Sequence, residues 1–241
     1  MTSSAPQVSV IIPARNEEAL IARCLDSIDH AAASYRGQVE VLVVLNRCTD
    51  ATEEIARQYG ARTIHEDARN LAKIRNTGVR AATGSVVVTI DADSAMSPNT
   101  LAALDRALAT GKTIGGGTRI VPDRWSLGIR VTLCLFEAWL LVSGFSGGLF
   151  WCHRADFEAI GGFNERLISG EDVDFARRLK AHGKNTGRPF STLRGAHITT
   201  SCRKFDAFGD WCVVKNPRRF LHLFRGNDRA AADAFYYDIQ R

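Results

Sequence analysis

Residues 86–94 read Val86-Val87-Val88-Thr89-Ile90-Asp91-Ala92-Asp93-Ser94, an apolar and largely β-branched run that ends in two carboxylates. Gly84 before it and the pair Ser97-Pro98 after it predict a buried strand in the middle of a sheet. Because side chains alternate along an extended strand, Asp91 and Asp93 should project to the same side. Two acids with no charge partner except a cation suit Mg²⁺ or Mn²⁺ bound to phosphate oxygens. The competing interpretation is a surface turn, because D-x-D alone is a weak motif.

The composition limits the classes of function. A formal net charge of +5 and a pI near 9.0 suit an anionic ligand or an acidic membrane surface, but they are too mild to indicate nucleic acid. Six cysteines without a C-x-x-C pair indicate reduced thiols rather than a metal cluster. Since the N-terminus shows no signal segment, we expect a cytoplasmic protein, and peripheral contact with the inner face of the membrane stays open.

Strands and helices alternate before the central stretch. Apolar runs predict strands over residues 8–13, 39–45 and 61–64. Helical spacing of apolar residues predicts helices over residues 20–28, 50–59 and 71–82. This alternation predicts right-handed βαβ crossovers and a mostly parallel sheet whose carboxyl ends share one edge, where a nucleotide site is expected. Neither G-x-G-x-x-G nor a P-loop follows the first strand, so dinucleotide binding is not indicated.

The second half of the chain has a different pattern. We expect a helix that begins at Ser97 and Pro98 and ends at Gly111. The most apolar segment runs from Trp125 to Trp151; two charged residues interrupt it, so a buried helix and a strand, with Trp151 in the core, are favoured over a membrane span. An interfacial helix stays open.

Five motifs, taken in order, resemble those of the family 2 glycosyltransferases, which have the GT-A nucleotide-diphospho-sugar transferase fold. They are P-x-x-N-E at residues 13–17, the aspartate of G-S-T-D-x-T at Asp50, R-N-x-G at 75–78, D-x-D at 91–93 and the E-D pair at 171–172. The resemblance extends from about Val8 to Trp211. Leu45 and Asn46 stand where the family carries two acids, so the nucleoside is not assigned.

The resemblance implies a single α/β domain over residues 1–241, with the GT-A fold and a Rossmann-like, mostly parallel central sheet flanked by helices. Residues 1–95 would bind the nucleotide sugar. Residues 96–241 would form the acceptor side and end in a basic, aromatic tail. The implied activity is metal-assisted, inverting transfer of a sugar from a nucleotide-diphospho-sugar donor to an acceptor hydroxyl.

The resemblance also assigns roles to side chains. Contacts to the donor fall to Pro13, Arg15, Glu17, Asn46, Asp50, Lys73, Arg75 and Asp91. The divalent cation, Mg²⁺ or Mn²⁺, would be held by Asp91 and Asp93, with His197 completing its shell. Arg203 and Lys204 match a basic stretch of small bacterial members and are candidates for the diphosphate; a solvated basic turn is the competing interpretation.

The resemblance assigns catalysis to Asp172 and to Glu171 beside it, with Asp172 as the general base. A carboxylate is needed to take the proton of the acceptor hydroxyl, and the start of a helix favours the ionised form that a base requires. The competing interpretation is that the two acids only cap the helix.

Two other classes of function stay open. A nucleotidyltransferase would carry a glycine-rich loop after the first strand, which residues 13–17 lack. A non-catalytic module that binds sugar nucleotides or a membrane surface would not need both acidic pairs. The apolar stretch at 127–151 and the basic tail at 215–225 favour a hydrophobic, lipid-linked or membrane-borne acceptor.

Overall fold

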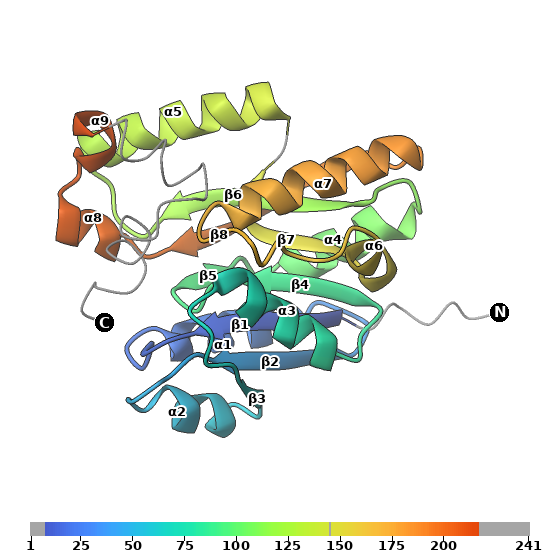
Figure 1. Cartoon of the computed structure of the whole chain (residues 1–241), viewed down its shortest axis with the longest axis horizontal. Coiled ribbons are helices and arrows are strands. Elements are labelled where there is room, and N and C mark those ends of the chain that lie inside the picture. Colours follow the sequence, from blue (N-terminus) through green and yellow to red (C-terminus); the bar gives the residue numbers. More distant parts are fainter. Residues whose placement is uncertain (1–7, 145, 217–241) are drawn as a thin grey trace.

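The computed structural model describes residues 8–144 and 146–216. Its strands form one sheet in the order β3-β2-β1-β4-β7-β6-β8-β5 (Figure 1). The strands are β1 (Val8–Ala14), β2 (Val39–Leu45), β3 (Arg62–His65), β4 (Val86–Ile90), β5 (Ser94–Met96), β6 (Gly115–Pro122), β7 (Gly147–His153) and β8 (Phe190–Thr200). Four of the seven pairings are parallel, so the predicted mostly parallel α/β sheet is confirmed.

The central stretch forms the boundary between two kinds of pairing. On one side, β1 to β4 pair in parallel, and every residue of β1 and β4 is buried, as expected for strands covered on both faces. On the other side, β4 pairs with β7 in the antiparallel direction. Trp151 in β7 is completely buried and donates its indole N–H to the carbonyl of Gly117, which confirms its place in the core.

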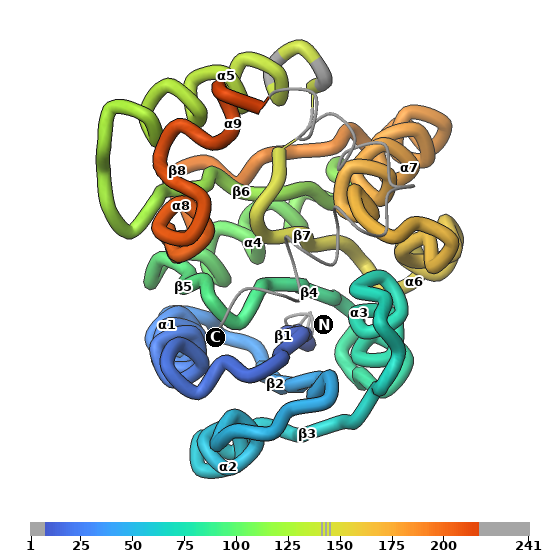
Figure 2. Tube along the Cα trace, turned by 60° about the vertical axis from the view of Figure 1, so that its left-hand side comes forward, coloured from blue at the N-terminus to red at the C-terminus, as the bar shows by residue number. Residues whose placement is uncertain are grey.

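Helices cover both faces of the sheet (Figure 2). One hydrophobic core joins the sheet to α1 (Ile21–Ala32), α2 (Thr52–Gln58) and α4 (Thr100–Ala109). A second core joins the opposite face to α3 (Leu71–Ala81), α6 (Arg154–Ala159) and α7 (Glu171–Asn185). The remaining helices are α5 (Leu127–Ser143), α8 (Arg203–Phe208) and α9 (Cys212–Lys215).

The chain after β4 differs from the expectation in two ways. The amide of Ser94 donates to the carbonyl of Asp91 at 3.0 Å, so the chain turns here and is not extended through Asp93. Residues 94–96 then form the short strand β5 against β8, and α4 begins at Thr100 instead of Ser97. The hydrogen bonds of β5 to β8 compete with an early helix start and define these boundaries.

Helix α5 was expected to be buried, and this prediction is wrong for one of its sides. Ile129 is fully buried, but Leu127, Leu135 and Val142 are largely exposed. Within the described residues, none of the helices has the length and hydropathy needed to cross a membrane.

Candidate active site

The carboxyl ends of β1, β2 and β4 meet at a pocket, as the parallel pairing predicts. Seven of the predicted site residues line it: Pro13, Arg15, Glu17, Asn46, Asp91, Asp93 and Glu171. Arg203 and Lys204, candidates for the diphosphate, line it as well. The structure therefore gathers residues from both halves of the chain at one edge of the sheet.

Arg75 lies behind this pocket between two acids. Its guanidinium donates to Oδ1 of Asp91 at 2.7 Å and to Oε1 of Glu171 at 2.5 Å, and it lies 5.3 Å from the centre of the Phe163 ring. Only 8% of the Arg75 side chain is exposed. Arg75 was expected to contact the donor, but it does not line the pocket, and its guanidinium is engaged by these two carboxylates. It bridges Asp91 and Glu171 beneath the pocket.

The two carboxylates on Arg75 have opposite pKa shifts. Burial raises the pKa of Glu171; Arg75 opposes this, but the charges of Asp172 and Asp91 add to the rise, and the pKa reaches about 7. Desolvation also raises the pKa of Asp91, but Arg75, with Lys204 and Arg203, outweighs it and holds the value below its usual range. Asp91 is therefore ionised at neutral pH, whereas Glu171 gains a proton near neutral pH.

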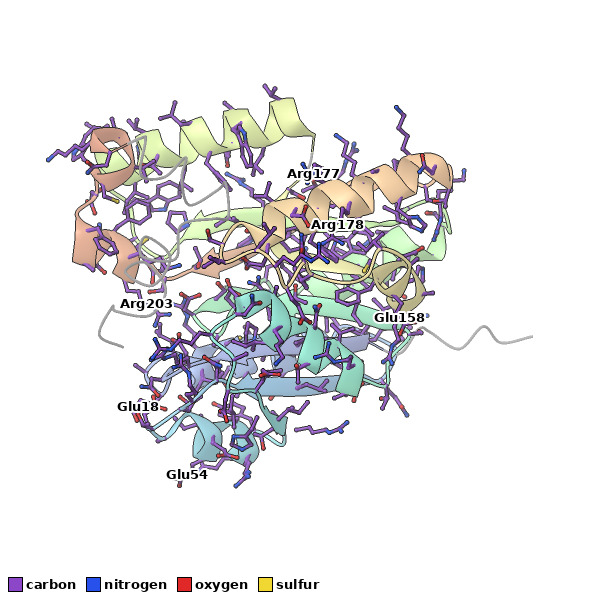
Figure 3. The ribbon with its side chains drawn as sticks, in the orientation of Figure 1. Glu18, Glu54, Glu158, Arg177, Arg178 and Arg203 are labelled. Atoms are coloured by element: carbon purple, nitrogen blue, oxygen red, sulfur yellow. The ribbon has the colours of Figure 1, made fainter. Side chains whose placement is uncertain are left out.

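Arg203, the first residue of α8, joins two further acids that line the pocket, and Figure 3 labels it on the same side of the molecule as Glu18. It donates to both carboxylate oxygens of Glu17, at 2.6 and 2.7 Å, and to Oδ2 of Asp93 at 3.0 Å. The expectation that Asp91 and Asp93 have no charge partner except a cation is therefore wrong. Arg75 pairs with the first aspartate, and Arg203 pairs with the second.

His197 does not lie with the two aspartates. Ser94 pairs with Thr200, and the amide of Ser201 donates to the carbonyl of Asp93, so it is the end of β8 that reaches the acids. His197 lies three residues earlier, roughly 10 Å back along an extended strand at about 3.3 Å per residue. It lines a separate pocket with Trp125. The predicted role of His197 as a third ligand is not supported by this position. Across residues 8–144 and 146–216, no group of three or more His, Cys, Asp and Glu side chains is arranged to hold a metal.

Two of the predicted donor-binding residues have local structural contacts instead. Asp50 accepts hydrogen bonds from the backbone of Glu18 and from both the amide and the hydroxyl of Thr52, so it ties the loop after β1 to the start of α2. Lys73 lies with its ammonium 3.5 Å from a carboxylate oxygen of Glu66. Neither residue lines the pocket.

Asp172 lies in the first turn of α7, as predicted, beside Glu171. Its Oδ1 accepts the N–H of Val173 at 2.8 Å. Asp172 does not itself line the pocket, whereas Glu171 does.

Asn46 has an unusual arrangement at the floor of the pocket. It is 1% exposed, and its amide N–H groups donate to the carbonyls of Glu66 and Ala68 at 2.6 and 2.9 Å. Because both bonds need an N–H donor, they identify the amide nitrogen of Asn46, and the other terminal atom of the side chain is therefore the oxygen Oδ1. Among the described residues nothing donates to this buried Oδ1, which makes it a ready acceptor for a ligand N–H.

Sequence reasoning missed the apolar wall of the pocket, which consists of Leu71, Ile74 and Ile168. Leu71 and Ile74 are one turn apart at the start of α3 and share one face of the predicted helix, but the phase of a helix does not distinguish a pocket wall from the core. Ile168 lies outside any helix or strand, and no sequence signal points to it.

Comparisons with known proteins agree with the fold. The family model described as "Glycosyl transferase family 2" matches residues 9–161, and "N-terminal domain of galactosyltransferase" matches residues 130–201. Glycosyltransferase AglE of Haloferax volcanii is 29% identical over 224 residues, which are 87% of this chain and 71% of that protein. EpsJ of Bacillus subtilis, an uncharacterized glycosyltransferase, is 34% identical over 97 residues, 38% of this chain and 27% of its own length.

Solved structures show the same fold at low identity. Residues 1–349 of Staphylococcus aureus TarS, in complex with UDP-GlcNAc, match with a TM-score of 0.63 at 17% identity, over 97% of this chain and 71% of that one. Mannosyltransferase PcManGT of Pyrobaculum calidifontis, in complex with GDP-Man and Mn²⁺, matches with a TM-score of 0.61 at 22% identity, over 96% and 74%.

Proposed function

This chain belongs to glycosyl transferase family 2, since the family model covers residues 9–161, and we propose that it moves a sugar from a nucleotide-diphospho-sugar to an acceptor hydroxyl with inversion at the anomeric carbon. It is a glycosyltransferase with the GT-A fold, in a family whose structural relatives hold nucleotide sugars. One observation carries the finer proposal: a single pocket brings together Asp91 and Asp93, Glu171 and the basic pair Arg203-Lys204. Family membership favours this reaction over nucleotidyl transfer.

We assign the nucleobase to Asn46. Its buried Oδ1 needs a donor, and uracil and guanine both present a ring N–H that could supply one. The relatives named above hold UDP-GlcNAc in one case and GDP-Man in the other, so this contact fits both bases and selects neither. Pro13 and Arg15 line the same pocket, and we assign Lys204 and Arg203 to the diphosphate.

Mg²⁺ or Mn²⁺ fits the donor set at Asp91 and Asp93. Mg²⁺ is commonly held by one or two carboxylates together with substrate phosphates, so a full protein cage of three ligands is not required. Arg75 occupies one oxygen of Asp91, and Arg203 occupies one oxygen of Asp93. When bound, the cation would compensate the charge that develops on the departing diphosphate.

Asp172 is the proposed general base. Glu171 is nearly fully buried and tied to Arg75, so it is poorly placed to accept a proton from an incoming hydroxyl. Asp172 is partly exposed in the first turn of α7. The hydroxyl that it deprotonates would attack the anomeric carbon from the side opposite to the diphosphate.

The acceptor is proposed to bind on the half formed by residues 96–241, with residues 1–95 holding the donor. The exposed apolar helix α5 belongs to this acceptor half and favours a hydrophobic, lipid-linked acceptor at the inner face of a membrane. Of the basic tail at 215–225, all but Lys215 and Asn216 lies outside the described residues.

The test first identifies the donor nucleotide sugar and then examines Asp172 as the general base. A thermal-shift panel of UDP-, GDP- and dTDP-sugars, with and without Mn²⁺, identifies the donor, because a ligand that binds the native state raises its stability. With that donor, Asp172→Asn should lower kcat by about 10² to 10⁴ while donor affinity changes little. The control is Asp29→Asn, which changes an exposed acid on α1.

The stereochemistry is read by NMR from the anomeric configuration of the product. Inversion supports the mechanism. Retention, or an Asp172→Asn variant with the activity of the control, would remove Asp172 from this role.

A further inference from the structure

Helix α5 is apolar on both of its sides. Arg130 and Glu137 are the charged residues among its 17. One side packs inward: Ile129 is buried, and Leu133, Phe136 and Leu140 face β6 across a groove. The other side, which we call the outer stripe, contains Leu127, Leu135, Trp139 and Val142, with exposed fractions of 69%, 57%, 38% and 90%.

An outer stripe of this kind is unusual for a helix in contact with water. A surface helix normally carries polar residues on its solvent side, and a cluster of exposed apolar side chains marks an interaction site. Figure 1 shows α5 along the outer margin of the molecule, with α9 beside its first turns. No described element covers the outer stripe, and Trp139, its largest side chain, is partly exposed.

Basic residues, which we call the basic border, lie on α5 and at its two ends. Arg130 lies on α5 itself, over the exposed ring of Trp125. Lys180 of α7 lies against Gly144, at the end of α5, and Lys215 belongs to α9 at the other end. The acid on α5, Glu137, lies 3.9 Å from Arg119, so its charge is balanced locally. Asp210, beside Gly128 in the first turn, is paired with Arg124, so Arg130 and Lys215 leave a positive charge around α5.

We propose that α5 lies flat on an anionic lipid bilayer, with Leu135, Trp139 and Val142 inserted at the level of the headgroups and with the basic border at the lipid phosphates. The pattern is that of an interfacial helix: apolar side chains on one side and cations beside them, each cation near the surface adding attraction to anionic lipid. Tryptophan is favoured at this depth because its ring is apolar and its N–H is polar. At about 1.5 Å per residue, α5 is roughly 25 Å long, less than the ~30 Å core of a bilayer.

The alternative occupant of the outer stripe is a second copy of this chain. A symmetric dimer through the outer stripe would bring the basic borders of the two copies close together, where they repel, and each copy has a net charge of +5. Charge complementarity therefore favours the membrane. The proposal rests on the part of the proposed function that places the acceptor at a membrane, but it does not depend on the transfer chemistry.

The test is flotation with vesicles of phosphatidylcholine alone and of phosphatidylcholine mixed with phosphatidylglycerol. The wild-type chain should float with the anionic vesicles at low salt and much less with the neutral ones. Leu135→Ser/Val142→Ser should lower the partition coefficient by about tenfold or more, because two large side chains lose apolar burial. Tyr59→Ser, which removes an exposed apolar side chain beside α2, is the matched control and should float like the wild type.

A second readout does not depend on the double variant being folded. The Trp fluorescence of the wild type should shift to the blue on anionic vesicles and be quenched by brominated lipid, and Trp139→Phe should remove most of both effects. Equal flotation of the wild type and the double variant, or a wild type that stays in the soluble fraction, would overturn the proposal.

Two further measurements separate this proposal from its alternatives. Light scattering that shows a dimer in the wild type and a monomer in the double variant, without vesicle binding, would assign α5 to a dimer interface and overturn the proposal. Stabilisation by sugar nucleotides should be equal in the wild type and the double variant. If no sugar nucleotide stabilises the wild type but lipid binding follows the outer stripe, the donor proposal fails and this one stands.

Discussion

Arg75 and Arg203 each hold two carboxylates at the same pocket, but they do so from very different surroundings. Arg75 projects from α3, is only 8% exposed and packs against Phe163. Arg203 is 22% exposed and begins α8, a helix of six residues of which none is buried. The buried arginine is part of the core, whereas the other is held mainly by the acids that it contacts.

The difference indicates separate duties for the two acids of the D-x-D pair. Arg75 and Glu171 are 8% and 5% exposed, so this pair lies in a nearly water-free environment, where removing one partner is costly; the same guanidinium also reaches Asp91, which is 48% exposed. Arg203 is more exposed than Arg75 and reaches Asp93 through one hydrogen bond of 3.0 Å, so this contact is easier to exchange for another ligand. Changes at Arg75 should therefore affect folding first, and changes at Arg203 should affect ligand binding first.

The largest expected effect follows from Arg75→Met. The variant leaves Glu171 buried without its cation, and we expect a loss of about 3–5 kcal/mol in the free energy of unfolding. Urea unfolding at neutral pH measures it. Arg80→Met changes an arginine on the same helix that is 59% exposed and lies 3.5 Å from Glu165, and it should cost about 1 kcal/mol or less. Equal losses in the two variants would contradict the distinction between a core and a surface arginine.

A smaller effect follows from the raised pKa of Glu171. In the unfolded chain this carboxyl ionises near its usual value of 4.5, but in the folded protein it keeps its proton up to a pKa of about 7. The folded state therefore binds the proton more tightly, and the resulting stability is fully present below pH 4.5 and is lost as pH rises through 7. The maximum difference is about 3 kcal/mol.

Glu171→Gln removes this titration and isolates it from all other groups. The difference in unfolding free energy between the wild type and the variant, followed by urea unfolding from pH 5 to 8, should change with pH in the direction just given. A difference that stays constant across this range would mean that Arg75 keeps Glu171 ionised throughout.

The smallest effect concerns Arg203→Gln. In the proposed donor site a divalent cation must share Asp93 with Arg203, so removal of the guanidinium should raise the affinity for Mn²⁺ alone by a few-fold to about tenfold, or roughly 1 kcal/mol. Mn²⁺ binding without nucleotide is measured by electron paramagnetic resonance. Arg57→Gln, which removes an exposed arginine paired with Glu53 on α2, should leave the affinity unchanged. Weaker Mn²⁺ binding in Arg203→Gln would show that Asp93 does not need to be released.

The sequence predicted the sheet and one side of the pocket because both depend on local patterns. Uninterrupted apolar runs identified β1, β2 and β4, and parallel pairing placed the residues that follow them at one edge. The partner of Asp93 was beyond such reasoning, since Arg203 is 110 residues away and its contact depends on where α8 packs. Burial of α5 was misjudged because apolar residues all round a helix indicate a covered helix, while the covering surface is set by the tertiary structure.

The turn at Asp91 to Ser94 connects the middle of the sheet to its last strand, because β4 lies at the centre of the strand order and β5 at one end. A single inserted residue here would shift β5 by one position against β8 and would exchange the faces of Ser94, Ala95 and Met96. The register of β5 against β8 therefore fixes the one-residue spacing between the two aspartates, in addition to any ligand that they bind. We expect this spacing to be kept even in a related protein that had lost its activity.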